Sequence, residues 1–352
     1  MSRVHLFNPE NDLALAADVD NYTPPVAARR LSEAGELLPL YWAEDGDIVL
    51  VDHSRLDAAR RFAASIRPGV EISATCPPDS VPDPWGWSRD TRRRYLRAGI
   101  SSGCLPSDAQ LSAWRQLSHR RSTILLSQSL GLIPPVEVHT PEQGLNEVKS
   151  LGYSAMLKLP WSSSGRGVFS VNTYDDQAIK ANITSHLRRQ GSIMVEKRCR
   201  VENDFAALYY VDNERVEFKG LSLFLTEGQG GRYAGNLLAS DAEIQSVICV
   251  DTAPIVQKVA LGLDNILKTS GYTGWVGVDM FTYFDSDNLI VNPCVEINLR
   301  RTMGVVAKEL YLRGYRGLLR VMATEGDPLC HPLLPSGKFT FSLCESISCL
   351  AR

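Results

Sequence analysis

The stretch from Gly277 to Arg300 constrains the fold of this 352-residue chain more than any other part of it. An apolar run carries Asp279, and a turn-like segment of Asp, Ser and Asn residues follows it. A second apolar run then carries Glu296 and Asn298. Two apolar runs joined by such a turn predict a β-hairpin, and residues two apart on a strand point to the same face. Glu296 and Asn298 are therefore expected to share one face.

The polar residues of this hairpin form a candidate metal site. Mg²⁺ prefers carboxylate and carbonyl oxygens and keeps nucleotide phosphates as further ligands. Asp279, Glu296 and Asn298 supply such oxygens, and Arg300 adds a fixed cation beside them. The exposed face of a hairpin also carries Asp, Glu and Asn where no metal binds. This stretch alone therefore leaves both interpretations open.

A second segment, about 120 residues upstream, has the features of a phosphate-binding loop. A short apolar strand ends in Lys158, a loop of Ser and Gly residues follows, and another apolar strand begins at Val168. Small residues let backbone N–H groups turn toward an anion, and hydroxyls add donors. The loop is not a Walker A motif, because the G-x-x-x-x-G-K-[ST] pattern is absent. Alone, it also fits an ordinary hairpin loop.

Taken in order, these elements resemble the ATP-grasp superfamily. The resemblance rests on the strand ending in Lys158, the Ser/Gly loop, an apolar strand ending in Glu196, and the Gly-Val-Asp279 and Glu296-Ile-Asn298-Leu-Arg300 elements. It covers about residues 118–325 and implies an α/β (α+β) protein with an ATP-grasp fold behind a small α/β domain. The implied domains are an N-terminal α/β domain (1–117), a small ATP-grasp subdomain (118–200), a C-terminal ATP-grasp subdomain with the metal site (201–328) and a tail (329–352).

The resemblance also implies roles for individual residues. Lys158 and Arg300 are the expected catalytic residues, with Lys158 on the ATP phosphates and Arg300 facing the transferred phosphoryl group or the substrate carboxylate. The expected metal ligands are Asp279, Glu296 and Asn298. The other expected nucleotide contacts are Ser162, Ser163, Ser164, Gly165 and Gly167 in the loop, Glu196, Lys197 and Arg198 beside the adenine, and Asp204 at the ribose.

Several of these assignments stay open. Such proteins often carry Asp-Lys where this chain has Ser118 to Arg121, so either Arg120 or Arg121 is the residue that reaches the nucleotide. Asn203 competes with Asp204 for the ribose. The second-tier phosphate contacts are Lys219, Arg232 and Asn236.

The function implied is an ATP- and Mg²⁺-dependent ligase, with Mn²⁺ as an alternative ion. It would join a carboxylate to an amine through an acyl phosphate, and both substrates would be small molecules or peptides. The alternatives are a small-molecule kinase of the same fold and a non-catalytic nucleotide-binding protein. Dimers are common in the family, so a homodimer is one assembly that the resemblance allows.

Composition excludes several other classes. There are 37 basic and 40 acidic residues, a formal charge of −3 that argues against general nucleic-acid binding. No apolar run approaches the ~18 residues of a membrane span, and the N-terminus lacks a signal-peptide core. A cytoplasmic protein without a membrane partner is therefore expected. The eight cysteines contain no C-x-x-C pair, which predicts reduced structural thiols.

The N-terminal third predicts a parallel α/β sheet. Apolar strands are expected at 3–7 and 48–52, the second followed by a helix over 56–65. The turn after the first strand carries Asn8, Glu10, Asn11 and Asp12. Ligands bind beyond the carboxyl ends of such strands, although a helix start with solvated acids fits this turn as well. Residues 86–121 contain eight arginines, a pattern that fits either an anion-binding surface or a solvated helix face.

Overall fold

The computed structural model describes residues 2–162, 165–212, 215–227, 232–322, 330–335 and 338–344. The chain forms two compact units, and the predicted α/β class is confirmed. Unit 1 comprises residues 1–112, 235–240 and 300–352, and unit 2 comprises residues 113–234 and 241–299. The domain boundaries expected from the sequence stay a prediction.

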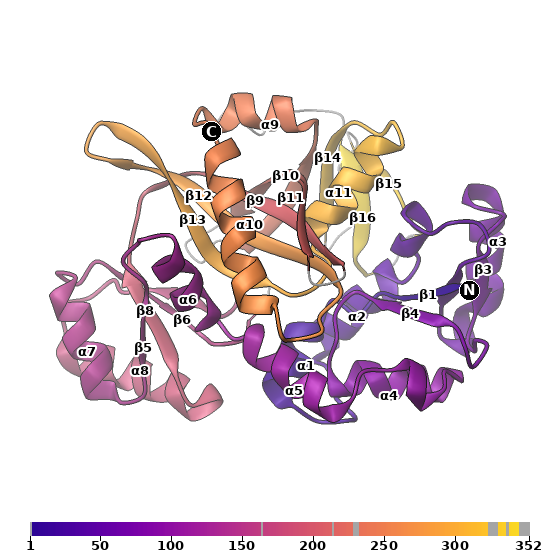
Figure 1. Cartoon of the computed structure of the whole chain (residues 1–352), viewed down its shortest axis with the longest axis horizontal. Coiled ribbons are helices and arrows are strands. Elements are labelled where there is room, and N and C mark those ends of the chain that lie inside the picture. Colours follow the sequence, from indigo (N-terminus) through magenta and orange to yellow (C-terminus); the bar gives the residue numbers. More distant parts are fainter. Residues whose placement is uncertain are drawn as a thin grey trace. The chain divides into compact units, whose positions relative to one another are not determined.

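Unit 1 contains a four-stranded parallel sheet, and both N-terminal strands expected from the sequence are confirmed in it. Its strand order is β3 (Glu71–Ser73), β2 (Ile48–Leu50), β1 (Arg3–Leu6) and β4 (Val81–Pro84). Its helices are α1 (Asn11–Ala17), α2 (Val26–Gly35), α3 (Leu56–Ile66) and α4 (Arg89–Ala98). Helix α3 lies beside β3 at one edge of this sheet (Figure 1). Strand β1 is central, so the turn that follows it lies at the carboxyl end of the sheet.

The rest of unit 1 is built around the C-terminal strands. The last residues of β11 (Arg232–Leu238) pair with β14 (Gly317–Met322), which continues to β16 (Thr340–Cys344) and β15 (Cys330–Pro332). Helix α11 (Met303–Leu312) contributes Val306 and Leu310 to a core that also contains Phe7 and Phe341. These apolar side chains join the N-terminal and C-terminal segments of the chain into one unit.

The cysteine expectation is wrong at one pair. Cys330 and Cys344 are joined by a disulfide between β15 and β16. The two residues are direct cross-strand partners in a pairing that the sequence did not predict. Free thiols are found at Cys76, Cys104, Cys199, Cys249 and Cys294, while Cys349 lies outside the described residues.

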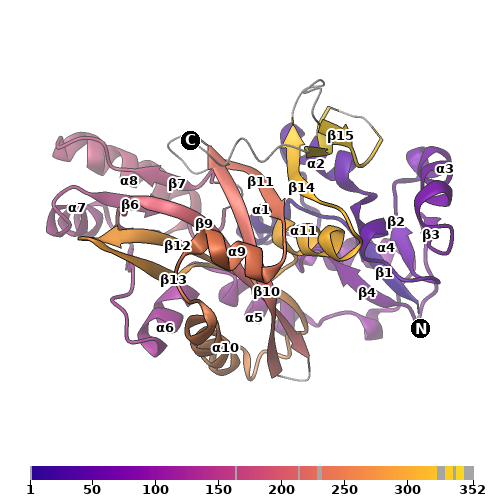
Figure 2. The same cartoon turned by 90° about the horizontal axis from the view of Figure 1, so that it is seen from above.

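Unit 2 begins with a small antiparallel sheet that contains the predicted Lys158 and Glu196 strands. Its order is β5 (Val136–Val138), β8 (Ile193–Lys197), β6 (Ala155–Lys158) and β7 (Val168–Ser170). Two helices, α7 (Pro141–Ser150) and α8 (Asp176–Gln190), lie side by side against it (Figures 1 and 2). Helix α7 begins with a capping box between Thr140 and Gln143, and α8 ends at Gly191 with φ of 81°.

The larger sheet of unit 2 contains the predicted hairpin. Strands β12 (Gly274–Asp285) and β13 (Asn288–Asn298) pair with each other, and β12 also pairs with β9 (Val201–Asp212), which pairs with β10 (Arg215–Glu227). Helix α10 (Ala253–Leu267) packs on β10, as its apolar spacing predicts, and also contacts α6 (Ser122–Ser129). The remaining helices are α5 (Asp108–Leu117) and α9 (Asp241–Ile248).

Membrane-spanning character is limited to one weak feature. Among the described residues, no single helix has both the length and the apolar composition of a membrane span. The bent pair α9 and α10 meets those two criteria only when its helices are taken together.

Candidate functional site

The hairpin of β12 and β13 brings the three expected metal ligands to one face. The register places Asp279 opposite Glu296 and Gly277 opposite Asn298. Residues directly opposite in an antiparallel pair share a face, as do residues two apart on one strand. Asp279, Glu296 and Asn298 therefore share a face, while the neighbouring Val278 is buried on the other.

A β-bulge lies just before Glu296. The ladder passes from the pair Asp279 and Glu296 to the pair Phe281 and Asn292, so β13 carries extra residues at this point. Pro293 occupies the bulge, where its missing N–H costs the ladder no hydrogen bond. Bulges bend a strand and re-aim side chains, and they occur often beside active sites. The Asn-Pro sequence thus explains locally why the strand changes direction immediately before the acidic residue.

Arg120 connects this hairpin to the loop after β6. Its side chain is buried, with 6% of the residue exposed. One guanidinium nitrogen, Nε, donates a 2.9 Å hydrogen bond to the carbonyl of Leu159, and Nη2 donates to Ser162 Oγ at 3.0 Å. The same Nη2 lies 2.8 Å from Glu296 Oε2. A single cation therefore joins the loop residue and the expected metal ligand.

The two arginines between which the sequence could not choose have different surroundings. Arg121 is exposed over 45% of its side chain and pairs with Glu137 at 2.7 Å. Arg120, by contrast, is buried beside Ser162 and Glu296. Both residues precede the same helix, so their spacing alone contained no signal that could separate them. Arg121 as a nucleotide contact stays a prediction, and Arg120 is the arginine that lies among the other candidates.

Lys158 and Glu196 form the second charged pair of the site. They lie on neighbouring strands β6 and β8, and Lys158 Nζ makes an ion pair with a carboxylate oxygen of Glu196. Lys158 is buried, so this pairing compensates its charge. Lys197, the last residue of β8, and Arg198, which follows it, are exposed. Of the three residues expected beside the adenine, only Glu196 thus contacts Lys158.

Asp204 lies within electrostatic reach of Lys158. Burial raises the pKa of its carboxyl group, and the hydrogen bond from Thr226 Oγ1 at 2.8 Å and the charge of Lys158 oppose that rise. The competing residue Asn203 instead bonds through its backbone and its side chain to Thr282 Oγ1. Asp204 is therefore the one that shares an environment with Lys158.

Cys294, on β13, is a buried free thiol. Burial raises the pKa of Cys294 far above its usual range, and the charges of Glu196, Lys158 and Asp279 all act on it. These three side chains therefore lie within electrostatic range of the same thiol. A buried thiol with a raised pKa is a poor nucleophile, which agrees with a site that works by positioning rather than by covalent attack.

The Ser/Gly loop is tightly packed at its described ends. Ser162 is buried, and a Cβ atom added at Gly167 would lie 2.3 Å from the Cβ of Ser162. Gly165 has a positive φ of 73°, which favours glycine. Ser163 and Ser164 lie outside the described residues. The glycines at 165 and 167 thus have local structural reasons for being there.

The remaining expected site residues are Lys219, Arg232, Asn236 and Arg300. Lys219 pairs with Glu217 on the same strand at 2.8 Å. Asn236 is buried and, like Arg300, belongs to unit 1. The side chain of Arg232 is not among the described ones. Their roles in nucleotide binding stay predictions.

Arg300 is held by Asp12, a partner that sequence spacing did not reveal. Its Nη2 lies 2.8 Å from one carboxylate oxygen of Asp12, and its Nε lies 3.1 Å from each of the two. Glu10, Asn11 and Asp12 are all buried. A helix does start here, since α1 begins at Asn11, but the expectation that its acids are solvated is wrong. Arg300 as a catalytic residue stays a prediction.

The donor set suits Mg²⁺ better than a softer metal. Two carboxylates and an amide oxygen on one face provide hard oxygen ligands only. Among the described residues, no group of three or more His, Cys, Asp or Glu side chains is arranged for a metal ion. The residues present thus fit an ion that takes its remaining ligands from phosphates and water.

Comparisons with known proteins identify the fold. No protein-family model and no curated protein matches the chain. A biotin carboxylase from Campylobacter jejuni, solved as a complex with βγ-ATP, is 15% identical, covers 96% of this chain and 80% of its own, and has a TM-score of 0.50. N5-carboxyaminoimidazole ribonucleotide synthetase from Thermus thermophilus is 14% identical, covers 98% and 94%, and has a TM-score of 0.49. D-alanyl-alanine synthetase A from Vibrio cholerae is 13% identical, covers 90% and 94%, and has a TM-score of 0.47. The chain therefore has the ATP-grasp fold.

Proposed function

We propose that this protein is an ATP- and Mg²⁺-dependent ligase that joins a carboxylate to an amine. In the first step, an oxygen of the substrate carboxylate attacks the γ-phosphorus of ATP, and ADP leaves as an acyl phosphate forms. In the second, the amine attacks the acyl carbon, inorganic phosphate leaves, and the nitrogen loses a proton as the amide forms. Both steps depend on positioning and charge stabilisation rather than on a protein nucleophile.

The observation that carries this proposal is the clustering of charges in unit 2. Arg120 bonds both Ser162 and Glu296, and the charges of Lys158 and Asp279 act on the same buried thiol, Cys294. Two cations and a set of hard oxygen donors in the same unit suit the phosphates of a nucleoside triphosphate and its ion. The biotin carboxylase that shares the fold was solved as a complex with βγ-ATP, which supports the choice of nucleotide.

Each residue has a proposed role. Lys158 and Arg120 would neutralise phosphate oxygens, and Ser162 would donate its hydroxyl to them. Asp279, Glu296 and Asn298 would hold Mg²⁺, which supplies charge neutralisation between the phosphates when bound. Glu296 would then exchange its contact with Arg120 for one with the ion. Closure of the Ser/Gly loop would exclude water, which otherwise hydrolyses an acyl phosphate.

Nucleotide binding is the first test. Thermal unfolding would be measured with ATP or ADP, with and without Mg²⁺, for the wild type and for Lys158→Ala. A ligand at one hundred times its Kd stabilises the folded state by about 2.7 kcal/mol. The wild type should show a Mg²⁺-dependent rise that Lys158→Ala lacks. Lys180→Ala is the matched control, because Lys180 is exposed and pairs only loosely with Glu142 at 3.3 Å.

Substitution of the central acid tests the metal assignment. Glu296→Gln keeps the size of the side chain and an oxygen for Arg120, but it removes the charge that the ion needs. Turnover is expected to be abolished while the circular dichroism spectrum is unchanged. Wild-type turnover in Glu296→Gln would show that Glu296 is not a metal ligand.

The chemical outcome is tested by trapping. Hydroxylamine added to the protein, Mg-ATP and candidate acids converts an acyl phosphate into a hydroxamate, which is detected by its iron complex or by mass. Hydroxamate formation together with ADP release supports the ligase. ADP release with a stable phosphorylated product and no hydroxamate would instead indicate a kinase.

A further inference from the structure

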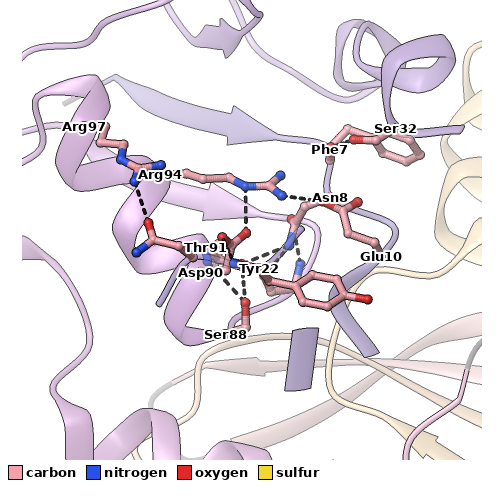
Figure 3. Close-up of polar contacts among 12 residues, drawn as sticks. Phe7, Asn8, Glu10, Tyr22, Ser32, Ser88, Asp90, Thr91, Arg94 and Arg97 are labelled. Carbon is pink, nitrogen blue, oxygen red and sulfur yellow. Dashed lines mark hydrogen bonds and ion pairs between the residues drawn. The ribbon is translucent and has the colours of Figure 1, made fainter. Parts of the chain in front are cut away.

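The turn between β1 and α1 in unit 1 contains a carboxylate oxygen that lacks a partner (Figure 3). Glu10 follows the carboxyl end of β1 and is 3% exposed. Its Oε1 accepts a 2.6 Å hydrogen bond from Arg94 Nη2, whereas no donor among the described residues reaches the buried Oε2. An unsatisfied buried acceptor costs about 1–3 kcal/mol. Ligands bind at the carboxyl ends of parallel strands, so we expect a ligand to supply the hydrogen-bond donor that Glu10 Oε2 lacks.

The charges around this turn favour a cationic ligand. Arg94 also contacts Asp90 Oδ2 at 2.8 Å, and Arg300 holds both carboxylate oxygens of Asp12. Glu10, Asp12, Asp90, Arg94 and Arg300, together called the turn cluster, thus contain three acids and two arginines. Both arginines are already engaged by acids, so an anionic ligand would find no uncompensated cation in the cluster. The charge that remains uncompensated is negative.

Neutral hydrogen bonds hold the turn in place. Asn8 Nδ2 donates to the carbonyl of Gly86 at 2.9 Å and to Thr91 Oγ1 at 3.0 Å, which ties the end of β1 to the start of α4. Gly86 permits this approach, since a Cβ there would lie 2.5 Å from Asn11 Nδ2. The carboxylate of Glu10 is therefore presented from a fixed backbone, as a preorganised binding group requires.

Tyr22 lies next to the turn cluster. Its backbone N–H donates to Asp90 Oδ1 at 2.9 Å, which holds the segment 18–25 against the turn cluster. Burial raises the pKa of the Tyr22 phenol, and the charges of Glu10 and Asp90 add to that rise. In the view of Figure 3, the Tyr22 ring lies below Asn8 and Glu10. An aromatic face next to a carboxylate is a typical setting for an ammonium group.

We propose that the turn cluster binds the ammonium group of the amine substrate, with Glu10 Oε2 as its acceptor and Tyr22 as its aromatic neighbour. The identification of this ligand as a substrate rests on the proposed ligase function, but its binding requires no nucleotide. Entry requires the segment 18–25, whose Asp20, Asn21 and Thr23 are exposed, to move away from Asp90. The ligand class is a primary amine that is protonated in solution.

Binding is tested without ATP, by NMR titration of the full chain with glycinamide. Neutral acetamide and anionic N-acetylglycine are matched probes of similar size. Saturable binding is expected for glycinamide alone. Glu10→Gln should weaken it about tenfold or more, because one charge-assisted hydrogen bond is lost. Glu33→Gln, on the exposed face of α2 in the same unit, is the control and should bind as the wild type does.

Four results would overturn the proposal. They are unchanged binding in Glu10→Gln, equal weakening in Glu33→Gln, preference for N-acetylglycine, and no saturable binding of glycinamide to the wild type. If Glu10→Gln does not fold, Asp90→Asn decides, because it lowers the negative charge and should also weaken binding. A protein that binds glycinamide through Glu10 but shows no Mg²⁺-dependent nucleotide shift would refute the ligase function and leave the ammonium site standing.

Discussion

Arg120 donates a 2.8 Å hydrogen bond to Glu296 across 176 residues of sequence. The guanidinium group therefore compensates the negative charge of Glu296. Arg120 also bonds the loop residue Ser162, so it links the loop to the hairpin. If Mg²⁺ displaced the Arg120 guanidinium from Glu296, the bond from Arg120 to Ser162 would change as well. Binding of the ion would then be coupled to the conformation of the loop after β6. This relationship leads to the first prediction.

Arg120→Met is expected to lower the free energy of unfolding by about 1–3 kcal/mol, because Glu296 loses its partner while half-buried. Mg²⁺ alone should then stabilise the variant more than the wild type, since the carboxylate no longer has to exchange partners. Urea unfolding with and without Mg²⁺ measures both effects. Arg121→Met is the control, because its partner is Glu137 and its side chain is largely exposed. An equal response to Mg²⁺ in the wild type and Arg120→Met would contradict the exchange.

Gly167→Ala is expected to disturb the loop after β6. The added Cβ would lie 2.3 Å from the Cβ of Ser162, so Ser162 must move and its hydrogen bond to Arg120 would break. Overpacking of this kind costs about 1–3 kcal/mol. Urea unfolding should show that loss, and the Mg²⁺-dependent nucleotide shift should shrink with it. Gly103→Ala is the matched control, because nothing lies within 4 Å of its added Cβ. Wild-type behaviour of Gly167→Ala would show that the contact is relieved without cost.

The local elements of this fold were readable from sequence because their signals are local. Alternating apolar residues and a polar turn predicted the hairpin of Asp279 and Glu296, and the strand that ends at Lys158 was found in the same way. The contacts between residues far apart in the sequence could not be predicted in this way. Asp12 and Arg300 are 288 residues apart, and nothing in either neighbourhood specifies the other. Burial separates Arg120 from Arg121, and burial depends on packing that a single sequence does not show.

The disulfide between Cys330 and Cys344 is a further pairing of this kind, and it leads to a stability prediction. It closes a loop with a sequence separation of 14 between neighbouring strands. In the chain-entropy model, a loop of this size stabilises the folded state by about 3 kcal/mol. Cys344→Ser, or reduction with dithiothreitol, should lower the urea midpoint of unit 1 accordingly. Cys199→Ser removes a free thiol and should have no such effect. Insensitivity of the wild type to the reductant would mean that the bond is absent in solution.

Asp204 and Asp83 are expected to change stability with pH in opposite directions. Burial would raise the pKa of Asp83, but the charge of Arg301 at 2.7 Å and the His5 ring nitrogen 2.8 Å from its Oδ2 hold that pKa well below 3.8. Because the folded state releases this proton more readily, Asp83 contributes stability above pH 3.8 that is lost as the pH falls further. Asp83→Asn should therefore be less stable than the wild type at pH 7, with a difference that shrinks in acid.

For Asp204 the sign is reversed, because burial raises its pKa above the ordinary value of 3.8. The folded state holds this proton more tightly than the unfolded chain does, so stability is greatest at low pH and falls as the pH rises through the raised pKa. Asp204→Asn imitates the protonated form and should be more stable than the wild type at pH 7. That gain should disappear as the pH approaches 3.8. Urea unfolding of Asp204→Asn between about pH 4 and pH 8, and of Asp83→Asn between about pH 2 and pH 5, measures the two slopes. If the stability gain of Asp204→Asn does not change with pH, the carboxyl charge is not its cause. An effect of side-chain shape alone does not depend on protonation.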